Sequence, residues 1–193
     1  AIVHAWYPGM QGGAAVADVL TGASEPGGRL PFAVPTDEAH LPHFDPEATA
    51  AFYDRWWGQR RLERDGRDIA FPFGFGLGYT TFEVTKLSVV DIDTEQMTAT
   101  ARVRVKNTGQ RPGATIVQMY AVGDAGPRRP KRQLVGFKRV AAEPGEREDL
   151  TVELSLRPLA QRDSGTGEWS IAPADYQLEA AQHAGDPDAI TSV

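Results

Sequence analysis

The sequence predicts a partial α/β domain followed by an all-β antiparallel sandwich. Residues 1–84 contain short apolar runs interrupted by seven prolines and many glycines, with helical spacing in one early stretch. From residue 85 onward, apolar and polar residues alternate with a period of two, which is typical of strands that bury one face. A length of 193 residues with 41% hydrophobic residues is enough for one or two globular domains.

The first region predicts few regular elements. Ile2–Trp6 is a short apolar run before Pro8-Gly9, which favours a buried strand over a helix. Ala14–Leu20 has apolar residues at helical spacing, and Gly22 is placed to end that helix in the left-handed conformation. A second short strand is expected over Leu30–Val34. Two or three such elements cannot bury a core alone, so we expect only part of a domain here.

The rest of the first region is polar, aromatic and rich in glycine. Glu47–Arg64 is expected to be partly helical, and Phe71–Phe82 to form a strand and a tight turn. The sequence also starts in apolar residues without Met, as if cut from something longer.

The second region predicts a sandwich with its own core. In Thr98–Val105, alanine and valine alternate with threonine and arginine, so the former should face inward. Further strands are expected every 15–20 residues, at Thr115–Val122, Gln133–Val140, Glu148–Leu154 and Tyr176–Ala181. Six or seven strands over residues 85–193 favour an antiparallel sandwich.

Composition and charge exclude several classes of function. The net charge of −6 argues against nucleic acid or an anionic membrane as the main partner. No run of 18 apolar residues could form a transmembrane helix, and the absence of cysteine excludes disulfides and thiolate chemistry. Residues 1–84 carry 6 basic and 11 acidic groups, a net charge of −5. Arginine outnumbers lysine 16 to 4, which hints at a bacterial genome rich in GC.

Candidate acid–base and metal groups are weighed against ordinary surface roles. The carboxylate clusters lie in polar, turn-like sequence, so solvated surface is the favoured interpretation: Asp37/Glu38, Glu63/Asp65/Asp68 and Glu146/Glu148/Asp149. His40, His43 and Asp45 lie close together, but zinc needs three or four converging ligands and Pro42 prevents a helical arrangement. No metal site is predicted.

An aromatic cluster is the main candidate for contact with a sugar. Trp56, Trp57 and Arg60 could supply stacking faces and a hydrogen-bond donor at a pocket rim. Because Trp56 and Trp57 are adjacent, at most one should face a pocket, and the other is expected in the core. The alternative for the whole group is packing between domains. The basic run Pro127–Arg132 is interpreted as a solvated loop that docks against the acidic first region, in preference to a nucleic-acid patch.

Three ordered motifs resemble glycoside hydrolase family 3. Trp6–Leu20 is similar to its WYPG…GG…ADVL segment, Gly22–Phe32 to its GRLPF segment, and Phe71–Phe82 to FPFG-x-GLSYTTF. Three later segments resemble the fibronectin type III-like domain that ends many of these enzymes: Val105–Gly109, Leu134–Phe137 and Trp169–Pro173. Gln59, Phe75 and Gly78 depart from the usual Tyr, His and Ser, which puts substrate preference in doubt.

The resemblance implies an architecture and an activity. Residues 1–84 would be the C-terminal part of an α/β sandwich domain, and residues 85–193 an immunoglobulin/fibronectin type III-like sandwich. The family implies retaining hydrolysis of terminal β-linked glucosyl or related residues without a cofactor. Both catalytic carboxylates would lie upstream, so no residue of this chain is expected to be catalytic.

The expected partners follow from the same resemblance. They are a β-glucoside or oligosaccharide substrate and the N-terminal barrel and α/β domains of the same enzyme. This segment would supply scaffold and pocket rim. The alternative is a non-catalytic, fibronectin-like binding or adhesion module.

Overall fold

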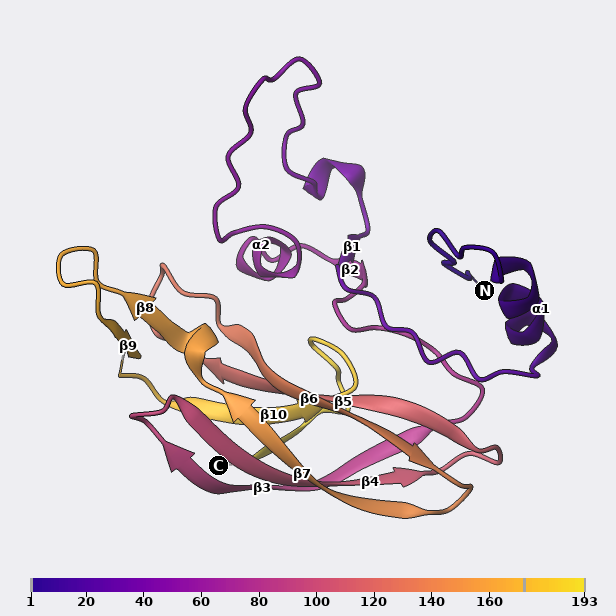
Figure 1. Ribbon diagram of the computed structural model, residues 1–193. Coiled ribbons are helices and arrows are strands. Elements are labelled where there is room, and N and C mark those ends of the chain that lie inside the picture. The colour runs from indigo at the N-terminus through magenta and orange to yellow at the C-terminus, as the bar shows by residue number, and fades with distance from the viewer. Residues whose placement is uncertain (1, 172, 193) are drawn as a thin grey trace.

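The centre of the molecule is a β-sandwich built from two antiparallel sheets (Figure 1). The computed structural model describes residues 2–171 and 173–192. One sheet has the order β11-β10-β5-β6 and the other β3-β4-β7. Their strands are β3 (Phe82–Asp93), β4 (Thr98–Asn107), β5 (Gly113–Gly123), β6 (Arg132–Ala142), β7 (Arg147–Ser155), β10 (Tyr176–Ala181) and β11 (Ile190–Ser192). The predicted antiparallel sandwich is confirmed.

The core of the sandwich follows the predicted alternation. Ala99, Ala101, Val103 and Val105 of β4 are buried, and Met119 of β5 is fully buried opposite them. Each strand therefore turns one face inward, as a period of two requires. Tyr176, Leu178 and Ala180 of β10 pack on the same core, although Tyr176 is only half-buried.

Short elements complete the sandwich end. The 3₁₀ turn η2 (Arg157–Leu159) leads into a hairpin of β8 (Ala160–Arg162) and β9 (Trp169–Ile171). This hairpin projects beyond the two sheets (Figure 1).

The first region lies over the β5–β6 sheet and has little regular structure (Figure 1). Its elements are α1 (Gly12–Thr21), β1 (Val34–Pro35), η1 (Glu38–His40), α2 (Gln59–Arg64) and β2 (Ile69–Phe71). Strands β1 and β2 pair with each other, and no described strand extends them into a larger sheet. None of the described helices is long and apolar enough to cross a membrane.

Helix α1 matches its prediction, whereas the strand before it does not. Gly22 ends α1 with φ of 76°, and its N–H donates to the Val19 carbonyl. The predicted strand Ile2–Trp6 is wrong: its described residues carry no regular structure and are exposed. A strand requires a neighbour to pair its backbone, and the described residues supply none there. The strand expected at Leu30–Val34 is reduced to β1.

Side chains of the two regions interlock along a seam above β5. Gln118 donates through Nε2 to the carbonyls of Gly74 and Gln182 at 3.1 and 2.5 Å. Gly74 has φ of 83°, and a Cβ there would collide with the Gln118 side chain. Tyr120 donates to Gln118 Oε1 at 2.6 Å, and burial raises the pKa of Tyr120, so its hydroxyl keeps the proton. Gln118 is therefore a fixed joint between the regions.

A buried asparagine forms a second joint. Asn107 accepts from Thr80 Oγ1 at 2.7 Å and from the Gly109 N–H at 3.0 Å. Its Nδ2 donates to the carbonyls of Arg111 and Ala142 at 2.8 and 2.9 Å. All four hydrogen bonds of the amide are thus satisfied, and they bind the segment before β3 to the β4–β5 turn and to the end of β6.

Candidate functional site

A groove lies where helix α2 faces the loop between β5 and β6. Its volume is about 380 Å³, within the range of small-molecule pockets. The first region contributes Trp56, Arg60, Glu63 and Arg64, and the loop contributes Asp124, Gly126, Pro127, Arg129, Pro130 and Lys131. Two of the three predicted sugar-binding residues, Trp56 and Arg60, therefore line one groove.

The two adjacent tryptophans point in different directions, as expected. Trp56 is half-buried in the groove wall, and the Arg64 guanidinium lies 5.0 Å from its ring centroid. Its backbone N–H donates to Asp54 Oδ1 at 2.7 Å, which fixes the turn before α2. Trp57 does not line the groove; it is 57% exposed and lies 5.4 Å from the Tyr53 ring.

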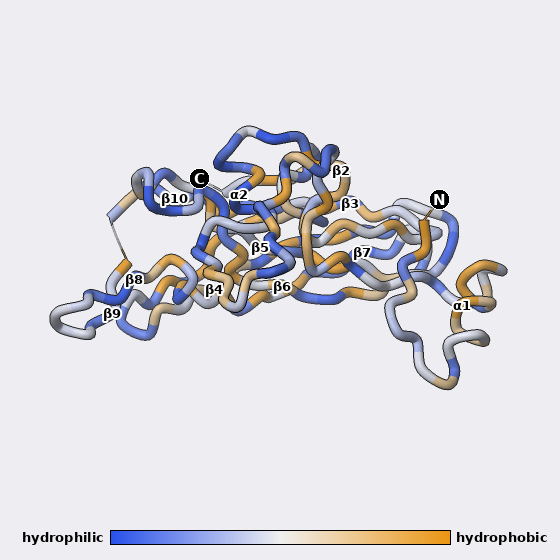
Figure 2. Tube along the Cα trace, turned by 90° about the horizontal axis from the view of Figure 1, so that it is seen from above, coloured by the Kyte–Doolittle hydropathy of each residue, from blue (hydrophilic) through white to orange (hydrophobic). Residues whose placement is uncertain are grey.

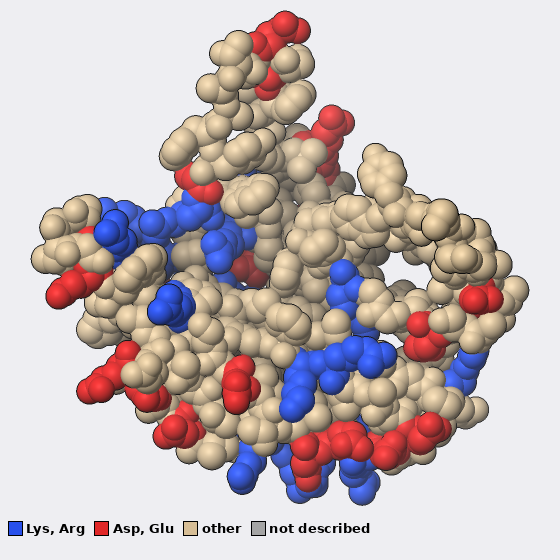
Figure 3. Space-filling view, in the orientation of Figure 1, with Lys and Arg blue, Asp and Glu red and all other residues tan. Residues whose placement is uncertain are grey.

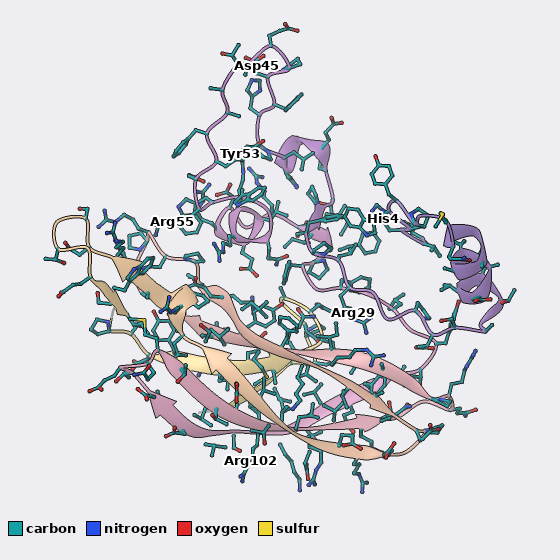
Figure 4. All side chains as sticks on the ribbon, viewed as in Figure 1. His4, Arg29, Asp45, Tyr53, Arg55 and Arg102 are labelled. Atoms are coloured by element: carbon teal, nitrogen blue, oxygen red, sulfur yellow. The ribbon has the colours of Figure 1, made fainter. Side chains whose placement is uncertain are left out.

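The expectation that the second tryptophan is packed in the core is wrong. Trp57 and Tyr53 lie on the loop that leads from η1 to α2, and this loop extends away from the sandwich (Figure 4). Phe44 and Phe52 on the same loop are also exposed. The loop therefore presents aromatic side chains to solvent and not to the described core.

Helix α2 is held against the sandwich by a cluster of charges. Arg132 at the start of β6 contacts Glu63 of α2 at 3.0 Å and Glu179 of β10 at 3.1 Å. Gln59 donates to Glu63 Oε1 and accepts from the Phe73 N–H, both at 3.0 Å. The prediction that Glu63 is solvated surface is wrong, because Arg132, 69 residues away, pairs with it.

The basic loop docks against the first region, in line with its sequence interpretation. Arg55 donates to the Arg128 carbonyl at 3.1 Å, and Arg132 pairs with Glu63. Arg129 donates to the Leu159 carbonyl at 2.6 Å. The space-filling view shows Lys and Arg side chains gathered where α2 meets this loop (Figure 3).

Three other candidate carboxylates serve local structure. Asp37 caps η1 by accepting from the Ala39 N–H at 2.8 Å. The Arg64 guanidinium beside Asp65 holds the pKa of that carboxyl below its usual value. Arg104 does the same to the pKa of Asp149, at 2.6 Å. A general acid needs a raised pKa, so these groups are tuned in the opposite direction.

His40, His43 and Asp45 lie close together in the sequence, which raises the question of a metal site. Among residues 2–171 and 173–192, no group of three or more His, Asp or Glu side chains is arranged to hold a metal ion. His183 approaches Asp186 at 4.0 Å and lies near the Phe75 ring.

Sequence reasoning missed the sandwich's share of the groove. Pro130 and Lys131 are far from α2 in the sequence and lie beside it only in the folded chain. The basic run has no aromatic residue near it in sequence, but in the fold Trp56 lines the same groove. Charge complementarity predicted that the basic run Pro127–Arg132 docks against the acidic first region, but it did not predict a groove between them.

Two family profiles match the chain in order. Residues 1–79 match the glycosyl hydrolase family 3 C-terminal domain, and residues 115–184 match the fibronectin type III-like domain. A probable beta-glucosidase H of Emericella nidulans is 34% identical over 92% of this chain. The chain spans only 22% of that relative's length.

Solved structures match over nearly the whole chain. Beta-glucosidase from Kluyveromyces marxianus, in complex with glucose, gives a TM-score of 0.82 at 32% identity over 97% of this chain and 23% of its own. DesR, a beta-glucosidase from Streptomyces venezuelae in complex with D-glucose, gives 0.82 at 28% identity over 97% of this chain and 25% of its own. Both parts of the chain thus recur together in one arrangement.

Proposed function

The chain belongs to glycoside hydrolase family 3, and from that premise we propose that it is the C-terminal part of a retaining β-glucosidase. The observation that carries the proposal is the continuous match to beta-glucosidase structures across both regions, with 32% identity in one case. The proposed substrate is a terminal β-linked glucoside, and the proposed partners are the barrel and α/β domains of the same enzyme. No cofactor takes part in this chemistry.

The exposed apolar surface of the first region supports a scaffold role. Ile2, Val3, Trp6, Tyr7 and Met10 are all more than half exposed. Orange segments around α1 and the N-terminal stretch lie at the surface (Figure 2). A contiguous apolar surface of this kind is typical of a face that packs against other protein. We assign it to the upstream part of the α/β domain.

The chemistry requires a nucleophilic carboxylate and an acid/base carboxylate about 5–5.5 Å apart. We place both outside residues 1–193. In support, Asp37 is a helix cap, Glu63 is paired with Arg132, and Asp65 and Asp149 are paired with arginines. This chain would then hold the surrounding sheet and shape the rim without donating or accepting a proton in the reaction.

We assign the pocket rim to Trp56, Trp57 and Arg60. Trp56 offers a ring face in the groove, Arg60 offers donors, and Trp57 offers an exposed ring on the neighbouring loop. The boundary between the two units is proposed at residues 84/85, within strand β3. A bacterial source stays a prediction from the arginine excess, because the curated relative named above is fungal.

A free-standing adhesion module is the alternative, and the hydrogen bonds and ion pairs between the two regions disfavour it. Such a module would need only the sandwich, whereas Gln118, Thr115 and Arg132 of the sandwich bond to Gly74, Arg29 and Glu63 of the first region. Arg29 reaches from the first region toward β5 (Figure 4). The sandwich is therefore shaped to carry this particular segment.

Reconstitution tests the proposed function. The 193-residue chain alone should not hydrolyse an aryl β-glucoside, whereas its mixture with a separately made N-terminal portion should, with retention of anomeric configuration. The matched variants are Glu63→Gln and Asp65→Asn. Activity in the chain alone that either variant abolishes would place the catalytic carboxylates inside this segment and overturn the proposal.

A further inference from the structure

The groove between α2 and the β5–β6 loop carries an excess of positive charge. Its cations are Arg60, Arg64, Arg129 and Lys131, and its carboxylates are Glu63 and Asp124. Arg132, outside the lining, pairs with Glu63 at 3.0 Å and also with Glu179 at 3.1 Å. The groove is therefore cationic in a chain whose net charge is −6.

Two of these cations are free to meet a ligand. Arg64 is engaged by Asp65 at 2.7 Å, and one Arg129 nitrogen donates to the Leu159 carbonyl. Arg60 and Lys131 are exposed and form no ion pair among the described residues. They come from opposite walls, one from α2 and the other from the loop, so an anion between them could meet both.

The same groove has one flat apolar face. Trp56 is half-buried there, with the Arg64 guanidinium over one face of its ring, and Pro127 and Pro130 stand in the loop wall. An indole face packs well on the C–H face of a pyranose ring, and the prolines add apolar contact without conformational freedom. A ligand that fits has a ring to stack and a carboxylate to pair.

We propose that this groove binds a carboxylate-bearing sugar ring, such as a uronate residue of an acidic saccharide. The ring stacks on Trp56, and the carboxylate is held between Arg60 and Lys131. The saccharide character of the ligand rests on the proposed function above. The acidic group goes beyond it, because a plain β-glucoside carries no charge.

A single-stranded nucleic acid is the competing polyanion, and the molecule favours it less. Nucleic-acid channels stack successive bases on several aromatic rings along a basic track. Here the groove lining contains one aromatic side chain, Trp56, and the chain's net charge of −6 disfavours a long polyanion. A groove of about 380 Å³ is also closer to one or two sugar rings than to a polymer track.

Binding to the 193-residue chain tests the groove apart from any catalysis. The probe is the indole N–H signal of Trp56 in proton–nitrogen NMR, assigned through Trp56→Phe, during titration with glucuronate, glucose, acetate and inorganic phosphate. We expect glucuronate to shift this signal with at least fivefold higher affinity than glucose, acetate or phosphate. The chain is used whole, so failure here leaves the reconstitution assay above as a separate test of the enzyme role.

Single substitutions test which charged side chains of the groove contact the ligand. Arg60→Gln and Lys131→Gln should each lower glucuronate affinity at least threefold, whereas Asp124→Asn should raise it because that carboxylate opposes the ligand. The control Arg102→Gln removes an exposed arginine on the far face of the sandwich and should change nothing (Figure 4). Backbone spectra report whether each variant stays folded.

Four outcomes would overturn the proposal. Equal affinity for glucose and glucuronate would mean a neutral-sugar site. Equal affinity for acetate or phosphate and glucuronate would mean a simple anion site. A single-stranded oligonucleotide that shifts the Trp56 signal more tightly than glucuronate would mean a nucleic-acid site. No shift of Trp56 with any probe would remove the groove as a binding site.

Discussion

The sandwich keeps most of its large apolar side chains out of solvent, whereas the first region leaves most of its own exposed. Met119, Val103 and Val117 are almost wholly buried, while Tyr7 and Met10 are fully exposed. Leu62 is the one described residue before β3 counted among the buried apolar core. Similar residue types thus meet opposite environments in the two regions, because only the second has enough strands to close a core.

This difference shows that the two regions are stabilised by different kinds of contact. The sandwich is stabilised by its own alternating strands. The first region is held at discrete points, such as Gln118 to Gly74 and Arg111 to the Gly22 carbonyl at 2.6 Å. Arg111 also lies 5.3 Å from the Tyr79 ring, and the Tyr79 hydroxyl donates to the Val19 carbonyl of α1. The first region depends on the second, and not the reverse.

Dividing the chain into its two regions should have the largest effect, because it tests directly which region folds alone. Residues 1–84 alone should give a poorly dispersed proton–nitrogen NMR spectrum, because their apolar side chains lack a core. Residues 79–193 should fold cooperatively and be more stable than residues 85–193, since they retain Val84 in the core and the Thr80 bond to Asn107. A well-dispersed spectrum for residues 1–84 would contradict the dependence argued here.

Truncating one apolar residue in each region tests the difference in burial between the two regions. Met119→Ala should destabilise the chain by about 2–5 kcal/mol, because a fully buried side chain leaves a cavity. Leu20→Ala in α1 should cost less than about 0.5 kcal/mol, because Leu20 is 66% exposed. Urea unfolding monitored by circular dichroism measures both, and equal losses would show that α1 packs as a core element in solution.

Removing the charge that joins the regions should have an intermediate effect. Arg132→Met leaves Glu63 and Glu179 without their cation, and the loss should be about 2–4 kcal/mol. Glu63→Gln should cost less, since Gln59 and a neutral amide can still bond. The readouts are urea unfolding and trypsin cleavage near α2; unchanged values in Arg132→Met would show that the pair is dispensable.

An exposed ion pair within the sandwich should give the smallest effect. Arg104 lowers the pKa of Asp149 in the folded chain, so its stabilisation is present above the unfolded pKa and is lost as pH falls through the folded pKa. The difference in melting temperature between wild type and Asp149→Asn should be small at pH 7 and should disappear as the pH falls below about 4. A difference that persists at pH 2 would mean another role for Asp149.

Much of the sandwich was predictable because alternation is a local signal. The bounds of β10 agree with the predicted Tyr176–Ala181, and β5 extends the predicted Thr115–Val122 by only a few residues. Strand β3 was not predicted as a separate element. Its pairing with β4 shifts register twice, and Lys86 has φ of 55°, so its apolar residues do not alternate cleanly.

The groove was not predictable because its walls meet only in the folded chain. The sequence identified Trp56 and Arg60 from residue type, but Arg129 and Lys131 come from a loop far along the chain. The same limit explains the error at Ile2–Trp6, where an apolar run suggests a strand but the described fold supplies no pairing edge. Local pattern predicts an element, and long-range contacts decide whether it forms.

The Gln118–Gly74 joint restricts how this protein could be recombined with others. Gly74 has a left-handed backbone and no room for a Cβ, because the side chain of Gln118 fills that space. A chimera that took its sandwich from another enzyme would need a side chain compatible with Gly74 at the position of Gln118. The two residues are 44 positions apart, yet they would have to be exchanged together. The crossover point for a successful graft therefore lies before Gly74 and not at the proposed boundary at residues 84/85.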